Sequence, residues 1–123
     1  MLEKDLQRAC LSRLSVWQMQ KVVVYYQDLS QFGLRYIRGL YVKRTTKGLP
    51  DIVAYVKHKG VCSICWFELK TTTKQSSHQL EWMLKFKDLT NVWYDIITEP
   101  NQVDNRIETI TGFYEQQLKD MTL

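Results

Sequence analysis

The first apolar pattern in the chain lies at the N-terminus and has helical spacing. Its members recur every three or four positions, at Leu2, Leu6, Ala9, Cys10 and Leu14. This period is that of one face of an α-helix, so we expect an amphipathic helix over residues 2–14. The pattern also allows the helix to continue to about Met19. Glu3 and Gln7 lie one turn apart on a flank of the apolar stripe, where they can face the edge of a sheet.

Strand patterns follow. Residues 15–29 are rich in Val, Tyr and Trp, and residues 91–98 alternate between apolar and polar positions. Both features favour strands. The segment 34–44 alternates aromatic or aliphatic residues with basic ones and is broken by Gly39, which predicts either an irregular hairpin or a loop over a nucleic-acid face.

Two further apolar segments, 51–57 and 61–69, read as a hairpin around the turn signal His58-Lys59-Gly60. Pro50 fits the beginning of the first strand because proline has no amide donor. The second strand is apolar enough to predict burial on both faces.

Two more helices are expected after this hairpin. The first begins near Ser76 or Ser77, and its inward positions are Gln79, Trp82, Met83 and Phe86. The last begins at Glu99-Pro100-Asn101, with an apolar stripe at Val103, Ile107, Ile110, Tyr114 and Leu118. The order αβββαβ(α) predicts an α/β or α+β fold, in which helices flank one mixed central sheet.

Composition narrows the class of protein. A chain of 123 residues is long enough for one domain, which we assign to residues 1–123, and too short for two. The longest apolar or aromatic run is Val22–Tyr26, so we expect no membrane span. Charged residues interrupt the N-terminus where a signal peptide would be apolar, which predicts a cytoplasmic location.

The cysteines do not form a recognisable metal or disulfide pattern. There are three of them, and an odd number argues against a disulfide framework. Cys62 and Cys65 form a C-x-x-C pair inside a predicted strand, where residues three apart point to opposite faces. We therefore expect buried thiols rather than a zinc site.

Positive charge gathers in the middle of the chain. Residues 34–85 contain ten Lys or Arg and three Asp or Glu, a balance of +7, whereas the whole chain carries +4. Such a basic region is typical of a surface that binds a polyanion. The alternative is that these residues only keep exposed strands and loops soluble.

Two of the three acids inside this basic region, Asp51 and Glu68, can be brought together by the hairpin. Asp51 lies eight residues from a turn centred at Lys59, and Glu68 lies nine, so the two meet at one end after a single bulge. Because side chains alternate along a strand, Glu68 and Lys70 share a face. We therefore predict two carboxylates and an ammonium in one place.

This set of groups suits phosphodiester hydrolysis. Carboxylate oxygens and water are the ligands that Mg²⁺ prefers, and Mn²⁺ can substitute for it. A bound Mg²⁺ polarises a phosphoryl oxygen, and Lys70 can orient water or neutralise the transition state. The alternative is a surface hairpin with an ordinary Glu-x-Lys pair.

Three short motifs together resemble a known family. They are Gly48-Leu49-Pro50-Asp51, Glu68-Leu69-Lys70 and Ser77-His78-Gln79. The combination resembles the PD-(D/E)XK nucleases, specifically the virus-type replication-repair nuclease (VRR-NUC) branch. The resemblance spans most of the chain and implies a restriction-endonuclease-like fold.

The resemblance also implies roles for individual residues. Asp51, Glu68 and the carbonyl of Leu69 would be metal ligands. Lys70 would serve the attacking water, and Gln79 would support the site. The acid of the first helix, Glu3, would take part in the inner or outer metal shell.

The expected substrate is DNA. From their position beside the site, Arg38, Arg44, Lys47 and Lys74 are the candidate phosphate contacts. The family includes nucleases that act on branched DNA, some of them homodimers resembling Holliday-junction resolvases. We therefore expect a Mg²⁺-dependent, structure-selective DNA endonuclease acting as a homodimer. A non-catalytic nucleic-acid-binding module with this fold and a sequence-specific restriction-type endonuclease are the alternatives.

Overall fold

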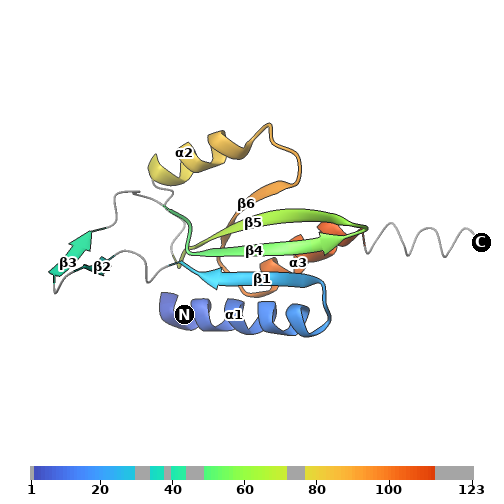
Figure 1. The fold of residues 1–123 in the computed structure, drawn as a ribbon, viewed down its shortest axis with the longest axis horizontal. Coiled ribbons are helices and arrows are strands. Elements are labelled where there is room, and N and C mark those ends of the chain that lie inside the picture. Colours follow the sequence, from blue (N-terminus) through green and yellow to red (C-terminus); the bar gives the residue numbers. More distant parts are fainter. Residues whose placement is uncertain (1, 30–33, 38–39, 44–48, 72–76, 113–123) are drawn as a thin grey trace, which may run out of the picture.

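A computed structural model describes residues 2–29, 34–37, 40–43, 49–71 and 77–112 of the chain (Figure 1). Its elements in chain order are α1 (Glu3–Met19), β1 (Val23–Asp28), β2 (Leu34–Ile37), β3 (Leu40–Lys43), β4 (Ile52–His58), β5 (Val61–Leu69), α2 (Ser77–Phe86), β6 (Val92–Ile97) and α3 (Asn101–Thr111).

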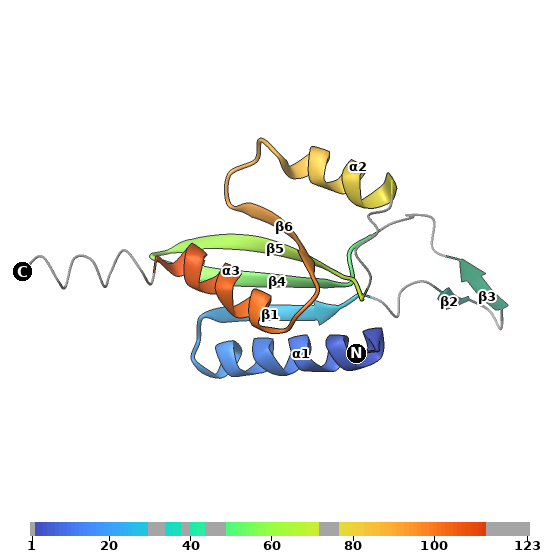
Figure 2. The ribbon, with the colours of Figure 1, turned by 180° about the vertical axis from the view of Figure 1, so that it is seen from behind.

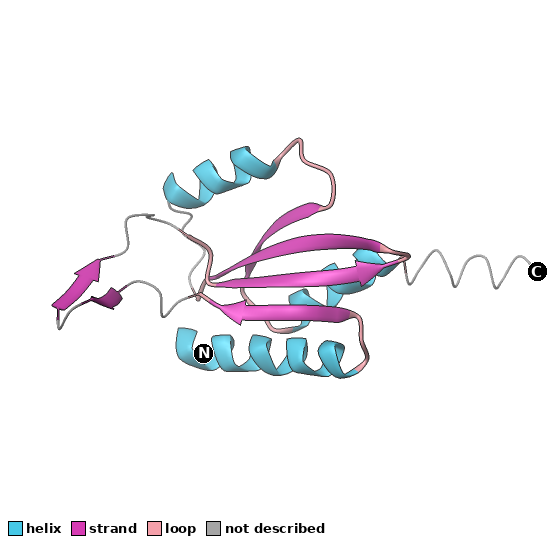
Figure 3. Cartoon of the chain, in the orientation of Figure 1, coloured by secondary structure: helices cyan, strands magenta, loops and turns pink. Residues whose placement is uncertain are grey.

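The sheet is mixed, as the sequence predicts. Its strand order is β1-β4-β5-β6, with β1, β4 and β5 antiparallel and β6 parallel to β5 (Figure 3). A parallel pair needs a crossover connection, and α2 lies in that connection. The strands β2 and β3 pair with each other in a separate antiparallel hairpin, so segment 34–44 contains a hairpin rather than only a loop. The chain therefore has the predicted α+β fold class.

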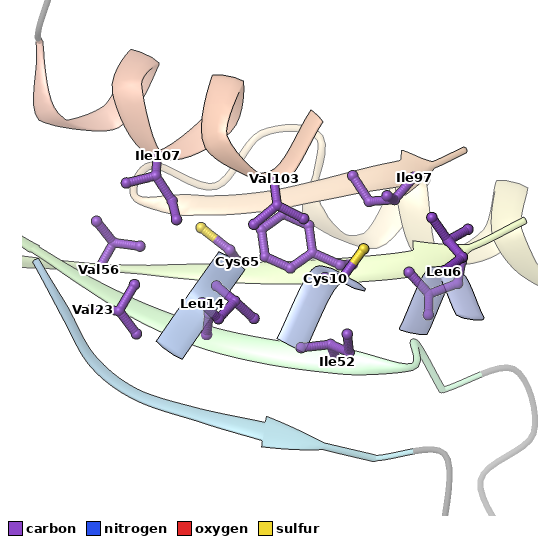
Figure 4. Close-up of a cluster of buried hydrophobic side chains, with 13 residues drawn as sticks. Leu6, Cys10, Leu14, Val23, Ile52, Val56, Cys65, Ile97, Val103 and Ile107 are labelled. Carbon is purple, nitrogen blue, oxygen red and sulfur yellow. The ribbon is translucent and has the colours of Figure 1, made fainter. Parts of the chain in front are cut away.

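The two faces of the four-stranded sheet are covered differently. The helices α1 and α3 lie on one face and α2 lies on the other (Figures 1 and 2). The main core forms on the α1 and α3 side (Figure 4), from Leu6, Cys10, Leu14, Val23, Ile52, Ala54, Val56, Cys65, Phe67, Leu69, Ile97, Val103 and Ile107. Removal of this apolar surface from water is the main force that holds α1 and α3 to the sheet.

Polar contacts fix the helices on the core side of the sheet. In α1, the Trp17 indole donates a hydrogen bond to Asp104 of α3 at 2.8 Å. In α3, the Arg106 guanidinium donates to both oxygens of Asp95 in β6, each at 2.6 Å. A two-pronged contact of this kind sets orientation as well as distance. These contacts tie α1 to α3, and α3 to the β6 strand of the sheet.

The first helix is longer than residues 2–14 and confirms the alternative that ends at Met19. Its inward face consists of Leu6, Cys10 and Leu14, each fully buried. Leu2 precedes the helix and is 72% exposed, so its predicted place in the apolar stripe is wrong. The stripe starts one turn later because α1 begins at Glu3, at the edge of the sheet.

The prediction that β5 is buried on both faces is wrong. Its burial alternates: Ser63, Cys65, Phe67 and Leu69 are buried, whereas Ile64, Trp66 and Glu68 are half-buried and the first two residues are exposed. The reason is that α2 covers its face of the sheet less completely than α1 and α3 cover theirs. The same incomplete cover leaves Met83 41% exposed, although its spacing predicts an inward position.

The last helix ends at Thr111. Gly112 follows it in the left-handed conformation, with φ of 67°, which is the usual way for glycine to terminate a helix. Val103 and Ile107 are buried as predicted. The predicted continuation of the stripe to Tyr114 and Leu118 lies outside the described residues.

The prediction that the cysteines are buried is correct for two of the three. Cys10 and Cys65 are buried free thiols, but Cys62 is exposed because it occupies the opposite side of β5. In the part of the chain that the structure describes, none of the helices has the length and apolar character needed to cross a bilayer.

A two-residue turn joins β4 to β5. His58 pairs with Val61, and between them Lys59 and Gly60 have φ of 49° and 77°. Positive φ at both central residues is the signature of a type I′ turn, which matches the twist of the flanking strands. The turn thereby sets the register that runs from His58 and Val61 to Ile52 and Phe67 at the far end.

Replacing Gly60 with alanine tests this turn. A Cβ atom at Gly60 would meet nothing within 4 Å, so the only cost is the positive φ. We expect Gly60→Ala to lower the free energy of unfolding by about 1–2 kcal/mol in urea denaturation. Gly60→Asn is the matched control and should cost less, because asparagine tolerates this conformation. Equal stability of Gly60→Ala and the unchanged protein would contradict the turn assignment.

Candidate active site

The ends of one helix and three strands meet at one end of the sheet. The start of α1, the end of β1, the start of β4 and the end of β5 lie together, opposite the β4–β5 turn (Figure 1). The register explains the meeting, because Asp28 pairs with Ile52 and Ile52 pairs with Phe67. Residues just beyond these pairs therefore lie close to one another in space, although they are far apart in the sequence.

Backbone hydrogen bonds fix Asp51 at this end. Its amide donates to the Phe67 carbonyl at 3.0 Å, and its carbonyl accepts from the Leu29 amide at 2.7 Å. The β4–β5 register continues without a shift to Ile52 and Phe67, so Asp51 and Glu68 follow directly and the bulge predicted from the sequence is not needed to bring them together. The Leu69 amide donates to the Asp51 carboxylate at 2.8 Å, which aims that side chain along the end of β5.

The Asp51 and Glu68 carboxyl groups lie close enough together for each to act on the pKa of the other. Burial, followed by the charge of Asp51, raises the pKa of Glu68 from its ordinary value of 4.5 to about 7. Burial also raises the pKa of Asp51, while the Leu69 amide opposes that rise. The two carboxylates therefore hold one proton between them when no cation is present, as closely spaced carboxyl groups do.

Glu3 lies close enough to contribute to the same electrostatic field. Its charge raises the pKa of both Asp51 and Glu68. It is the first residue of α1 and is exposed to solvent. The structure thus brings the predicted first-helix acid to the carboxylate pair.

Asp28 is an additional acid near the site that the sequence analysis did not single out. It ends β1, and its charge raises the pKa of Asp51. Its carboxylate accepts a hydrogen bond of 2.7 Å from the side-chain amide of Gln7 in α1. The antiparallel β1–β4 register places it here, and that register could not be read from the sequence because the 23 residues from Leu29 to Asp51 separate the two strands.

Lys70 follows directly after the end of β5, and strand alternation predicts that it shares a face with Glu68. It is half-buried, and its amide donates to the Ile97 carbonyl of β6 at 2.9 Å. Its positive charge lowers the pKa of Glu68, against the effect of burial. The ammonium therefore belongs to the same group of charges as the two carboxylates.

Gln79 reaches the site from α2. Its side chain is 2% exposed, and hydrogen bonding to Glu68 lowers the pKa of that carboxyl group. The helix is seated on the sheet by aromatic contacts: Trp66 of β5 lies 5.9 Å from both Trp82 and Phe86, measured between ring centroids. This packing brings the predicted glutamine to the predicted glutamate.

Tyr94 of β6 is another neighbour that the sequence analysis did not assign to the site. Its ring packs against Phe86, with 6.4 Å between centroids. Burial raises the pKa of its hydroxyl, and the charges of Glu68 and Asp51 add to that rise. The parallel pairing of Tyr94 with Trp66 places it on the α2 side of the sheet. Nothing in the sequence distinguishes an aromatic residue near such a site from one in any other strand.

The predicted DNA contacts are not part of the described structure. Arg38, Arg44, Lys47 and Lys74 all lie outside the described residues. Their proposed role stays a prediction from the sequence.

The carboxylate pair fits a divalent cation in its donor chemistry. Two oxygen acids that already share a proton can exchange that proton for a hard cation. Across the described ranges, however, no group of three or more His, Cys, Asp or Glu side chains is arranged as a metal site. The groups available to such an ion are therefore the carboxylates of Asp51 and Glu68, the Leu69 backbone and the nearby Glu3.

Comparisons of the chain with protein-family models, with curated proteins and with solved structures find no match.

The shared proton predicts a pH-dependent stability for the metal-free protein. Because the pKa of Glu68 is about 7 in the folded state and 4.5 ordinarily, folding favours the protonated form. The stabilising effect is complete below the lower value and is lost as the pH rises through the higher one. We expect a loss of about 1–2 kcal/mol between about pH 5 and about pH 8, reduced by the partial exposure of the carboxyl group.

Urea denaturation at these two pH values measures the effect. Glu68→Gln should remove most of the difference, because glutamine has the shape of the protonated acid and cannot lose a proton. Glu108→Gln, on α3 at the other face of the sheet, is the control and should retain the difference. If Glu68→Gln kept the same difference in the free energy of unfolding between the two pH values, groups other than Glu68 would be its cause.

Proposed function

We propose that this protein is a Mg²⁺-dependent DNA endonuclease with its active site at Asp51, Glu68 and Lys70. The observation that carries the proposal is the pair of half-buried carboxyl groups that follow the last β4–β5 pair, with the charge of Lys70 acting on Glu68. At and above neutral pH, two acids held together in this way cost the fold stability, because burial and mutual repulsion oppose the ionisation of Glu68. Such perturbed groups gather at functional sites more often than elsewhere.

The residues have separate roles in this proposal. Asp51 and Glu68 would hold the cation through their oxygens, with the Leu69 carbonyl and Glu3 as further donors. When bound, Mg²⁺ would polarise a phosphoryl oxygen and favour ionisation of water. Lys70 would orient the attacking water and balance the charge that develops on the phosphate. Gln79 would keep the Glu68 carboxylate in place from α2.

The proposed substrate is branched DNA, and the proposed assembly is a homodimer. The net charge of +4 and the basic region 34–85 support a polyanionic substrate. The exposed side of α2 supports association, because Leu80, Met83 and Leu84 are 52%, 41% and 63% exposed within one helical stripe. Apolar patches of this kind are often covered by a partner. Light scattering of the purified protein measures the mass directly.

Cleavage assays on four-way junction, flap, nicked and linear duplex DNA with Mg²⁺ or Mn²⁺ test the activity. We expect Glu68→Gln and Lys70→Ala each to lower kcat by at least about 100-fold while DNA binding changes little, because these groups act on the transition state. Lys57→Ala is the matched control, since Lys57 is exposed near the opposite end of the sheet. Equal cleavage by Lys70→Ala and the unchanged protein would contradict the proposed site.

Titration of the metal-free protein with Mn²⁺ separates this proposal from a non-catalytic DNA-binding module. A nuclease site should take up the ion at Asp51 and Glu68, and Glu68→Gln should weaken that uptake. DNA binding without any uptake of Mn²⁺ would favour the binding module. Cleavage of linear duplex as fast as junctions would contradict structure selectivity and leave the metal site intact.

A further inference from the structure

Two buried polar atoms on the face of β5 and β6 that points toward α2 have no hydrogen-bond partner among the described residues. They are the hydroxyl oxygen of Tyr94 and Oε2 of Glu68. An unpaired buried polar group costs about 1–3 kcal/mol, so folded proteins normally supply a protein or water partner. Two such atoms near one another call for a common partner.

The strand register places both groups over the same face. Tyr94 pairs with Trp66, and Glu68 lies two residues beyond Trp66 along β5. Residues two apart in a strand point the same way, so Tyr94 and Glu68 both point toward α2. The charge of Glu68 acts on the tyrosine hydroxyl, yet neither atom is bonded to the other. The Tyr94 hydroxyl oxygen and Oε2 of Glu68 are therefore near each other but farther apart than the length of a hydrogen bond.

The chemistry of the two atoms selects the group that can lie between them. With the proton of the pair held between Asp51 and Glu68, Oε2 of Glu68 only accepts hydrogen bonds, whereas a tyrosine hydroxyl can donate. A phosphoryl oxygen, which also only accepts, would satisfy Tyr94 and leave Glu68 unpaired. A water molecule can donate to Oε2 of Glu68 and accept from Tyr94, and so satisfies both.

We propose that Tyr94 is a positioning residue of this site, whose hydroxyl holds one buried water against Oε2 of Glu68. Its effect on metal binding and cleavage rests on the proposed nuclease function. Gln79 approaches the same carboxyl group from α2, so Glu68 is held by groups from a helix and from the neighbouring strand. Groups that orient a metal-binding carboxylate without touching the metal commonly change metal affinity or activity 10–100-fold when removed.

Tyr94→Phe removes the hydroxyl and keeps the ring that packs on Phe86. We expect Mn²⁺ affinity, measured without DNA, to fall about 10-fold and kcat to fall by a similar factor. The KM for DNA should not change, because the hydroxyl does not contact DNA. This split distinguishes positioning from a general loss of structure, which would lower kcat and weaken DNA binding together.

Tyr25→Phe is the matched control. Tyr25 is 47% exposed on β1, and its hydroxyl donates to Gln27 at 2.9 Å, away from the carboxylates. The same chemical change there should leave Mn²⁺ affinity and kcat unaltered. Equal effects of the two substitutions would overturn the proposal.

A high-resolution crystal structure of the metal-free protein tests the water independently of any activity. An ordered water within hydrogen-bond distance of both atoms supports the proposal, and a direct Tyr94–Glu68 bond or the lack of such a water overturns it. If the protein neither binds Mn²⁺ nor cleaves DNA, the proposed function fails, and the crystal structure still decides the role of Tyr94. If it does both and Tyr94→Phe behaves as the unchanged protein, only Tyr94 loses its role.

Discussion

The pairing of β4 with β5 is the constraint on which the rest of this molecule depends. A turn of two residues closes the pair, so its register admits little slippage, and a slip of one residue would turn every side chain to the opposite face. The register puts Ile52 and Phe67 into the core while Glu68 points the other way. The same alignment that buries the apolar residues also brings Asp51 to Glu68. Folding and the formation of the carboxylate pair are therefore one event.

Sequence patterns predicted the parts of this structure that depend on neighbours along the chain. Alternation put Glu68 and Lys70 on one face, the turn signal at Lys59-Gly60 gave the hairpin, and helical spacing gave the buried face of α1. The meeting of Asp51 with Glu68 also followed, because one short hairpin connects them. Even Gln79 could be named, since it begins the inward stripe of α2.

What could not be predicted depends on contacts between distant segments. Asp28 joins the acids only because β1 pairs with β4 across a long intervening segment, and no local pattern specifies that pairing. Tyr94 reaches the site through a parallel pairing that a whole helix separates from β5. The exposure of Met83 and the half-burial of Trp66 reflect how far α2 covers the sheet, which is a property of the packed layers. An apolar strand has the same composition whether one or both faces are covered.

The alternation of β5 also has a practical consequence for its cysteines. Only thiolates react readily with alkylating reagents. Burial raises the pKa of Cys10 to about 11 and that of Cys65 to about 12, so both are almost fully protonated near neutral pH. Cys62, three residues from Cys65, is exposed near the β4–β5 turn, at the end of the sheet away from the carboxylates. A maleimide dye added to the native protein would thus attach at one defined position without mutagenesis, and could report on DNA or on a second subunit by energy transfer.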